Sequence, residues 1–141
     1  MKRTFEKKVV IITGASSGIG LATAREFAAN GARLVLAARS EDKLQEIAGE
    51  LSSLADVLCV KTDVSVMEDC KNLIDKTIDR FGGIDILINN AGISMRALFN
   101  DMDLSVMERL MAVNFWGTVY CTKFALPWLL KSKGSVVGVI S

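Results

Sequence analysis

The sequence has no histidine, one proline and one tyrosine among its 141 residues, and only three cysteines. The lack of histidine excludes histidine-activated nucleophiles, histidine general bases and histidine-containing zinc sites. Cys59, Cys70 and Cys121 are widely spaced in apolar surroundings. We interpret them as buried reduced thiols and expect neither a disulfide nor a metal site. A formal net charge of +1 without a clustered basic face argues against a nucleic-acid partner.

Long apolar runs are also lacking. The longest one late in the chain, residues 124–130, is far shorter than the ~20 residues that span a bilayer. Positive charges precede an apolar run near the start, as in a secretion signal, but that run ends at Thr13-Gly14. We therefore expect a cytoplasmic protein without membrane contact. Half of the residues are hydrophobic, which is enough for one soluble α/β domain over residues 1–141.

The most informative segment runs from Val9 to Gly20. An apolar, strand-forming run breaks into Thr-Gly-Ala-Ser-Ser-Gly-Ile-Gly at residues 13–20 and then continues with a helical pattern. Glycines allow a sharp turn and close backbone approaches, and the following helix directs unpaired N–H groups at an anion above the turn. This pattern predicts a phosphate-binding turn; an ordinary strand-to-helix turn is the alternative. No lysine follows Gly20, which excludes a Walker-type loop.

Strand-like and helical segments alternate along the rest of the chain. Candidate strands cover residues 8–13, 33–38, 57–62, 84–89 and 135–140, and helical patterns cover 18–30, 41–54, 66–81 and 104–131, the last as one helix or two. This order predicts a three-layer α/β/α Rossmann-type fold, a doubly wound parallel sheet with strand order 3-2-1-4-5. We expect Ser40 to cap the second helix, Gly82 to end the third, and Pro127 to kink or end the last.

Ligands of such sheets bind at the carboxyl ends of the strands, so the residues there are candidates for chemistry. Arg39, directly after Ala38 at the end of the second strand, could pair with a 2′-phosphate that an acidic residue would repel. Its alternative interpretation is a surface arginine. Asp63 ends the third strand and, from the residues alone, is a helix cap. Residues 89–92, Asn-Asn-Ala-Gly, follow the fourth strand.

The sequences of residues 13–20 and 89–92 follow the first and the fourth predicted strand, as the corresponding motifs do in the short-chain dehydrogenase/reductase family. The chain resembles this family over essentially its whole length. The resemblance implies an NADP(H) site, because Ala38 stands where NAD-preferring members carry an acid. It implies cofactor contacts at Gly14, Ser16, Ser17, Gly18, Ile19, Gly20, Arg39, Asp63, Val64, Asn90, Ala91 and Gly92, with Asp63 and Val64 beside the adenine.

Asn114 lies among apolar residues of the last helical pattern, where an amide needs a structural or catalytic reason. The resemblance implies that Asn114 is catalytic and holds a water that relays protons to a lysine. The alternative is an amide that attaches the helix to the fourth strand. From residue 112 to 130 the pattern is apolar nearly all round, which predicts a helix buried on both sides. The resemblance implies that it packs against its twin in a homodimer or homotetramer.

Family members carry hydride chemistry on a serine and a Tyr-x-x-x-Lys motif, which this chain lacks. Its one tyrosine, Tyr120, is a residue too close to Lys123. Ser141 matches the first of two serines, so the catalytic serine would be Ser141 or the next residue. We therefore expect the N-terminal part of a longer protein, without the C-terminal strands of the fold and inactive alone.

The resemblance implies an NADP(H)-dependent oxidoreductase that transfers hydride between nicotinamide and a small carbonyl or secondary alcohol. The alternative is a non-catalytic NADP(H)-binding sensor or scaffold. The substrate itself cannot be read from the sequence. Met95, Arg96 and Leu98 suggest only a mixed apolar pocket wall.

Overall fold

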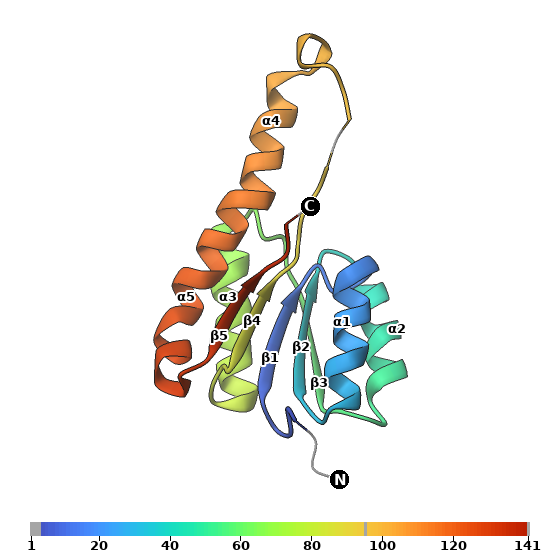
Figure 1. The fold of residues 1–141 in the computed structure, drawn as a ribbon, viewed down its shortest axis with the longest axis vertical. Coiled ribbons are helices and arrows are strands. Elements are labelled where there is room, and N and C mark those ends of the chain that lie inside the picture. Colours follow the sequence, from blue (N-terminus) through green and yellow to red (C-terminus); the bar gives the residue numbers. More distant parts are fainter. Residues whose placement is uncertain (1–3, 95, 141) are drawn as a thin grey trace.

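The strands form one parallel sheet in the order β3-β2-β1-β4-β5 (Figure 1), in a computed structural model that describes residues 4–94 and 96–140. The strands are β1 (Val9–Thr13), β2 (Arg33–Ala38), β3 (Val57–Lys61), β4 (Ile86–Asn89) and β5 (Ser135–Gly138). The chain runs outward from β1 to β3 and then crosses back to β4 on the other side of β1. The predicted fold class and strand order are confirmed.

Helices cover both faces of this sheet (Figure 1). They are α1 (Gly18–Ala29), α2 (Glu41–Leu51), α3 (Met67–Phe81), α4 (Leu104–Met111) and α5 (Gly117–Ser132). Helices α1 and α2 lie on one face, and α3 and α5 on the other, while α4 extends beyond the carboxyl edge of the sheet. A short 3₁₀ turn, η1 (Phe99–Asp101), precedes α4, and a π turn, η2 (Ala112–Trp116), joins α4 to α5.

The apolar core has two halves, one on each side of the sheet. Neighbouring residues of β1 alternate between them: Val10 and Ile12 pack toward α1 and α2, and Ile11 packs toward α3 and α5. All three are fully buried, and burying such a side chain stabilises the fold by about 1.5–3 kcal/mol. Because both faces of β1 are filled, a ligand cannot bind on either face of this strand and has to bind at one of its ends.

Helix ends follow the predicted signals at two places. The Ser40 side chain accepts a hydrogen bond from Lys43 N at 3.4 Å and so caps α2. Gly82 ends α3 in the left-handed conformation, with φ of 75°. Ser40 therefore turns the chain at the carboxyl end of β2, and Gly82 turns it back before the amino end of β4.

The structure bears on two predictions for the last helix, the effect of Pro127 and the burial on both sides. Pro127 lies inside α5, which continues to Ser132, so it does not end the helix. The missing N–H is tolerated because Pro127 and Lys123, whose carbonyl loses its partner, are both solvent-exposed. Within one chain the helix is buried on one side: every fourth residue, such as Cys121 and Ala125, is buried, and Leu130 on another face is 68% exposed, so burial of the second side by a partner stays a prediction. An all-round apolar pattern therefore includes a face that one chain leaves uncovered.

Candidate functional site

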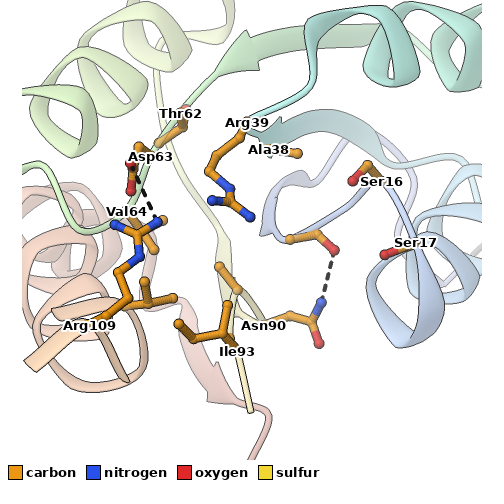
Figure 2. Close-up of a pocket in the computed structure, with 14 residues that line it drawn as sticks. Ser16, Ser17, Ala38, Arg39, Thr62, Asp63, Val64, Asn90, Ile93 and Arg109 are labelled. Atoms are coloured by element: carbon orange, nitrogen blue, oxygen red, sulfur yellow. Dashed lines mark hydrogen bonds and ion pairs between the residues drawn. The ribbon is translucent and has the colours of Figure 1, made fainter. Parts of the chain in front are cut away.

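A cavity of about 230 Å³ opens at the carboxyl ends of the strands, where the strand order reverses (Figure 2). The loop after β1, the ends of β2 and β3, the segment after β4 and the helix after it all contribute to its wall. The structure brings most predicted cofactor residues together there: Gly14, Ser16, Ser17, Arg39, Asp63, Val64, Asn90, Ala91 and Gly92 line the cavity. Gly18 and Gly20 lie at the start of α1.

The turn after β1 is packed so closely that side chains could not fit at two of its glycines. A Cβ on Gly14 would lie 2.8 Å from Ala91 Cα, and one on Gly20 would lie 2.5 Å from Asn90 Nδ2 and closer still to the Gly14 carbonyl oxygen. Gly14 also has a φ of 62°, which favours glycine. The two glycines therefore let the turn close onto the segment after β4.

Thr13 and Asn90 hold these two segments in register. Thr13 Oγ1 accepts hydrogen bonds from the backbone N–H groups of Asn90 and Ala91 at 3.0 Å each, and donates to the Ile88 carbonyl at 3.4 Å. Asn90 Nδ2 donates to the Gly14 carbonyl at 3.0 Å. The floor of the cavity is thus rigid before any ligand binds, which lowers the entropic cost of binding.

The start of α1 supplies free donors above this floor. Ser17 is the N-cap of α1, and its side chain makes no capping bond to the described residues. The first N–H groups of the helix therefore remain available to an anion, and the helix dipole favours one there. Ser16 and Ser17 line the cavity beside them with two further hydroxyl donors.

Arg39 adds a positive charge at the far side of the cavity. It is exposed at the end of β2, and Figure 2 shows its guanidinium pointing into the cavity. It makes no ion pair with a described residue. Ala38 before it is buried and offers no carboxylate, so this corner can accept an anionic group.

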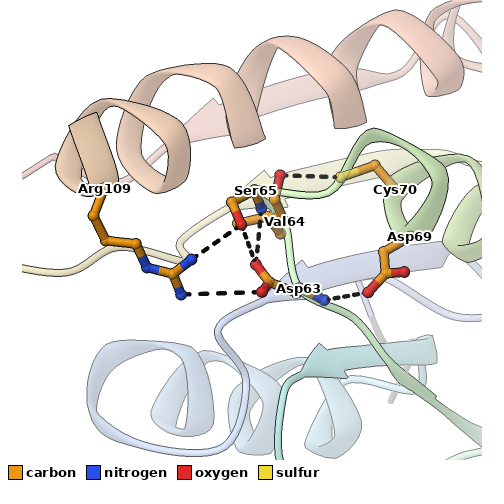
Figure 3. Close-up of polar contacts among 6 residues, drawn as sticks. All are labelled: Asp63, Val64, Ser65, Asp69, Cys70 and Arg109. Carbon is orange, nitrogen blue, oxygen red and sulfur yellow. Dashed lines mark hydrogen bonds and ion pairs between the residues drawn. The ribbon is translucent and has the colours of Figure 1, made fainter. Parts of the chain in front are cut away.

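Asp63 does not cap the third helix as predicted, and its carboxylate is held instead by Ser65 (Figure 3). The N-cap of α3 is Val66, and Asp63 Oδ1 instead accepts from Ser65 N at 3.0 Å and Ser65 Oγ at 2.6 Å. Partial burial disfavours the charged form, but the Ser65 hydrogen bonds and the positive charges of Arg109 and Arg39 hold the pKa of this carboxyl below its usual range. Asp63 is therefore an anion at neutral pH.

A second cavity of about 420 Å³ continues from the first and shares the segment from Asn90 to Ile93. Ile19 and Asn114 line it. Asn114 lies in the π turn, where Oδ1 accepts from Ile93 N and Nδ2 donates to Ile93 O, both at 2.8 Å. The amide thus attaches the helix to the segment after β4. This is close to the alternative role predicted from the sequence, in which the amide attaches the helix to the fourth strand. Such π turns are frequent at functional sites.

Comparison with known proteins identifies the family of this arrangement. Residues 8–141 match the family model described as short chain dehydrogenase. The chain belongs to the short-chain dehydrogenase family. It is 50% identical over 137 residues to the 11-beta-hydroxysteroid dehydrogenase-like 4A protein of Arabidopsis thaliana, covering 95% of this chain and 46% of the relative. It is also 50% identical over 133 residues to 11-beta-hydroxysteroid dehydrogenase A of Sesamum indicum, covering 92% and 38%. The chain therefore spans less than half the length of these curated relatives.

Solved structures of short-chain dehydrogenases share the fold. An alcohol dehydrogenase from the archaeon Thermococcus sibiricus, in complex with 5-hydroxy-NADP, superposes with a TM-score of 0.92 at 35% identity, covering 94% of this chain and 57% of that one. L-sorbose reductase from Gluconobacter frateurii, in complex with NADPH and L-sorbose, gives 0.93 at 33% identity, covering 98% and 54%. A Burkholderia phymatum family member in complex with NAD gives 0.93 at 31%, covering 97% and 50%. Both dinucleotides thus occur among these structures.

Two residues of the site in this short-chain dehydrogenase were not predicted from the sequence. Thr13 is the hydrogen-bonding centre of the cavity floor, and Arg109 from α4 lines the cavity wall. Thr13 had a usable signal, since it is the last residue of β1 and begins the glycine-rich turn. Arg109 had none, because its contact with Ser65 joins residues 44 positions apart.

Four further candidate residues were predicted from the sequence. Met95 and Ser141 lie outside the described residues. Arg96 and Leu98 are exposed, and neither is among the residues lining the two cavities.

In residues 4–94 and 96–140, none of the helices combines the length and the apolar character that a bilayer crossing requires.

The close packing of Gly20 yields a test of the turn. We expect Gly20→Ala to lower the free energy of unfolding by about 1–3 kcal/mol, because the added methyl group overlaps the Gly14 carbonyl. Gly49→Ala is the matched control: Gly49 is also helical, and a Cβ there meets no other atom within 4 Å. It should stabilise by roughly 0.5–1 kcal/mol. Urea unfolding measures both, and equal effects of the two changes would contradict the packing argument.

Proposed function

We propose that the full-length protein is an NADP(H)-dependent oxidoreductase that transfers hydride between nicotinamide and a small carbonyl or secondary alcohol. One observation carries the proposal: two adjoining cavities follow the carboxyl edge of the sheet, with Arg39 in the first and Asn114 in the second. A dinucleotide is an elongated ligand with an anionic middle, and this path passes the start of α1. Family membership supports the same reading.

Each part of the cofactor has residues suited to it. The turn from Gly14 to Gly20 and the start of α1 would hold the pyrophosphate, with donors from Ser16 and Ser17. Asp63 and Val64 would flank the adenine, and the small residues Ala91 and Gly92 would let a ribose approach the backbone. Bound NADPH would supply the hydride. The residues of this chain would bind and orient it and would exclude water from the buried side.

Arg39 supports NADP(H) over NAD(H). Its guanidinium can make a bidentate, charge-assisted contact with a 2′-phosphate, and Ala38 leaves no carboxylate to accept the ribose hydroxyls of NAD(H). The structural neighbours include complexes with both cofactor types, so this preference depends on Arg39 itself.

Asn114 would act beside the nicotinamide end. Since both amide atoms already bond Ile93, we propose that its backbone carbonyl oxygen holds the water that relays a proton. The amide would then be the element that keeps the π turn, and hence this carbonyl, in place.

The test is a comparison of cofactors on the full-length protein. We expect the Kd for NADPH to be lower than that for NADH by about tenfold or more, because a hydrogen bond to a charged group contributes about 1.5–3 kcal/mol. Titration followed by protein fluorescence measures both constants. Equal affinities would contradict the cofactor assignment.

Turnover separates an enzyme from a binding module. Oxidation of NADPH with a panel of carbonyl compounds, or reduction of NADP with secondary alcohols, is expected for the enzyme. The names of the plant relatives make a hydroxysteroid the first alcohol to test. Tight NADPH binding without turnover, and a full-length sequence without Tyr-x-x-x-Lys, would favour the sensor or scaffold. The cytoplasmic location and the homodimer or homotetramer stay predictions.

A further inference from the structure

We propose that Arg109 is a positioning residue that holds the Asp63 carboxylate so that one of its oxygens reads the exocyclic amine of the adenine. The inference rests on the proposed NADP(H) site. Arg109 comes from α4 and Asp63 from the end of β3, and both line the first cavity. Figure 3 shows the guanidinium facing Asp63 and Ser65 together.

The backbone and one oxygen of Asp63 are already occupied. Asp69 Oδ2 accepts from Asp63 N at 2.9 Å, which fixes the backbone from the first turn of α3. Asp63 Oδ1 takes both hydrogen bonds from Ser65. The remaining oxygen, Oδ2, is the one that can accept a hydrogen bond from a ligand.

Arg109 orients Asp63 Oδ2 without occupying it as a hydrogen-bond acceptor. Its Nη1 donates to Ser65 Oγ at 3.3 Å, while Nη2 lies 4.0 Å from Asp63 Oδ2. A separation of 4.0 Å is an ion pair and too long for a hydrogen bond. Asp63 Oδ2 is therefore attracted toward Arg109 and keeps its acceptor capacity. Both side chains are partly exposed, at 42% for Arg109 and 31% for Asp63, so a ligand can reach them.

A second cation makes this positioning necessary. Arg39 lies across the same cavity, close enough for its charge to act on Asp63 (Figure 2). Without Arg109, the carboxylate would be attracted toward Arg39 alone. It would then turn away from the adenine and partly neutralise the arginine proposed for the 2′-phosphate. Arg109 thus keeps the two recognition groups of the cavity separate.

The experiment compares NADPH with its hypoxanthine analogue, in which an oxygen replaces the adenine amine. For the full-length protein we expect the Kd to favour NADPH by about tenfold or more, because the analogue presents an oxygen to Asp63 Oδ2. Arg109→Met, which keeps an unbranched, flexible side chain but removes the charge, should reduce this preference to less than about threefold. Arg109→Lys should restore part of it, since the positive charge is kept.

Two further readouts distinguish positioning from a structural role. Arg109→Met should raise KM for NADPH and leave kcat unchanged, because the adenine lies far from the reacting carbon. Arg80→Met is the matched control: Arg80 also forms an ion pair, with Asp56, but outside the two cavities. It should leave the preference between NADPH and its analogue as it is.

The outcomes separate this inference from the function on which it rests. A protein that binds neither dinucleotide overturns both. A protein that prefers NADPH to the analogue, with the same preference in Arg109→Met, keeps the cofactor site and overturns the role of Arg109. If Arg109→Met does not fold, Arg109→Lys decides: a preference lower than in the unmodified protein supports the role, and an unchanged KM and preference overturn it.

Discussion

Arg39→Asp is expected to reverse the cofactor preference of the full-length protein from NADPH to NADH. Removing the guanidinium loses a charge-assisted contact with the 2′-phosphate, worth about 1.5–3 kcal/mol, or roughly a 10- to 100-fold rise in the Kd for NADPH. The new carboxylate adds repulsion of the phosphate and can accept the ribose hydroxyls of NADH. Fluorescence titration with both dinucleotides measures the ratio of the two constants.

Two controls show whether the effect belongs to this position. Arg39→Ala removes the attraction without adding repulsion, so it should abolish the preference without reversing it. Lys61→Asp makes the same change of charge on the neighbouring strand, since Lys61 is the register partner of Ala38, but Lys61 does not line the first cavity. It should change the affinity ratio by less than about threefold at physiological salt. A preference for NADPH that survives in Arg39→Asp would contradict the proposed phosphate contact.

The fold could be predicted because its signals are local and agree with one another. Each strand is a short apolar run, and each helix has its own period and end signal, such as Ser40 and Gly82. The parallel direction of the strands then follows from their alternation with helices, whereas the strand order 3-2-1-4-5 was predicted from the Rossmann-type fold. The prediction that Pro127 could end the last helix failed because the effect of a proline depends on its surroundings. Here the carbonyl that loses its hydrogen-bond partner lies on an exposed part of α5.

The site residues at the ends of strands could be predicted from the sequence. Those whose role depends on contact between distant elements could not. The turn after β1 and the segment after β4 could both be read from the sequence, and the structure places them in contact through Thr13 and Asn90. The role of Gly117 is visible only in three dimensions: a Cβ there would lie 2.7 Å from Val64 Cγ2, so the glycine lets α5 reach the end of β3. A pattern search within one helix cannot detect such a contact.

The π turn at residues 112–116 is a further feature that periodicity missed. It adds one residue to a single turn, which shifts the apolar pattern too little to distinguish one helix from two. Within this turn the Asn114 amide reaches sideways and pairs with both backbone polar groups of Ile93. One side chain thus joins the helix to the end of the sheet at the point where the helix is widened, beside the second cavity.

Asn114→Ala is expected to lower kcat for carbonyl reduction by about 10²–10⁴-fold in the full-length protein, the usual contribution of acid/base catalysis. The change keeps the carbonyl that we propose holds the relay water, but it removes both bonds to Ile93 that fix the π turn. The carbonyl then moves, and proton delivery fails. The Kd for NADPH should change by less than about threefold, because Asn114 lies in the wall of the second cavity, away from Arg39 and Asp63.

Steady-state kinetics and NADPH titration on the same variant distinguish the two roles of Asn114. If the amide only attaches the helix to the segment after β4, its loss displaces Gly92 and Ile93, and NADPH affinity should fall in proportion to turnover. If the main effect is on the carbonyl of the relay, kcat falls much more than NADPH affinity and its solvent deuterium isotope effect increases, because proton transfer becomes rate-limiting. Asn100→Ala, at an exposed asparagine in η1, is the control and should alter neither constant. Carbonyl reduction that proceeds undiminished in Asn114→Ala would exclude the relay and leave Asn114 a structural residue, because a proton path through its carbonyl cannot survive the loss of the bonds that place it.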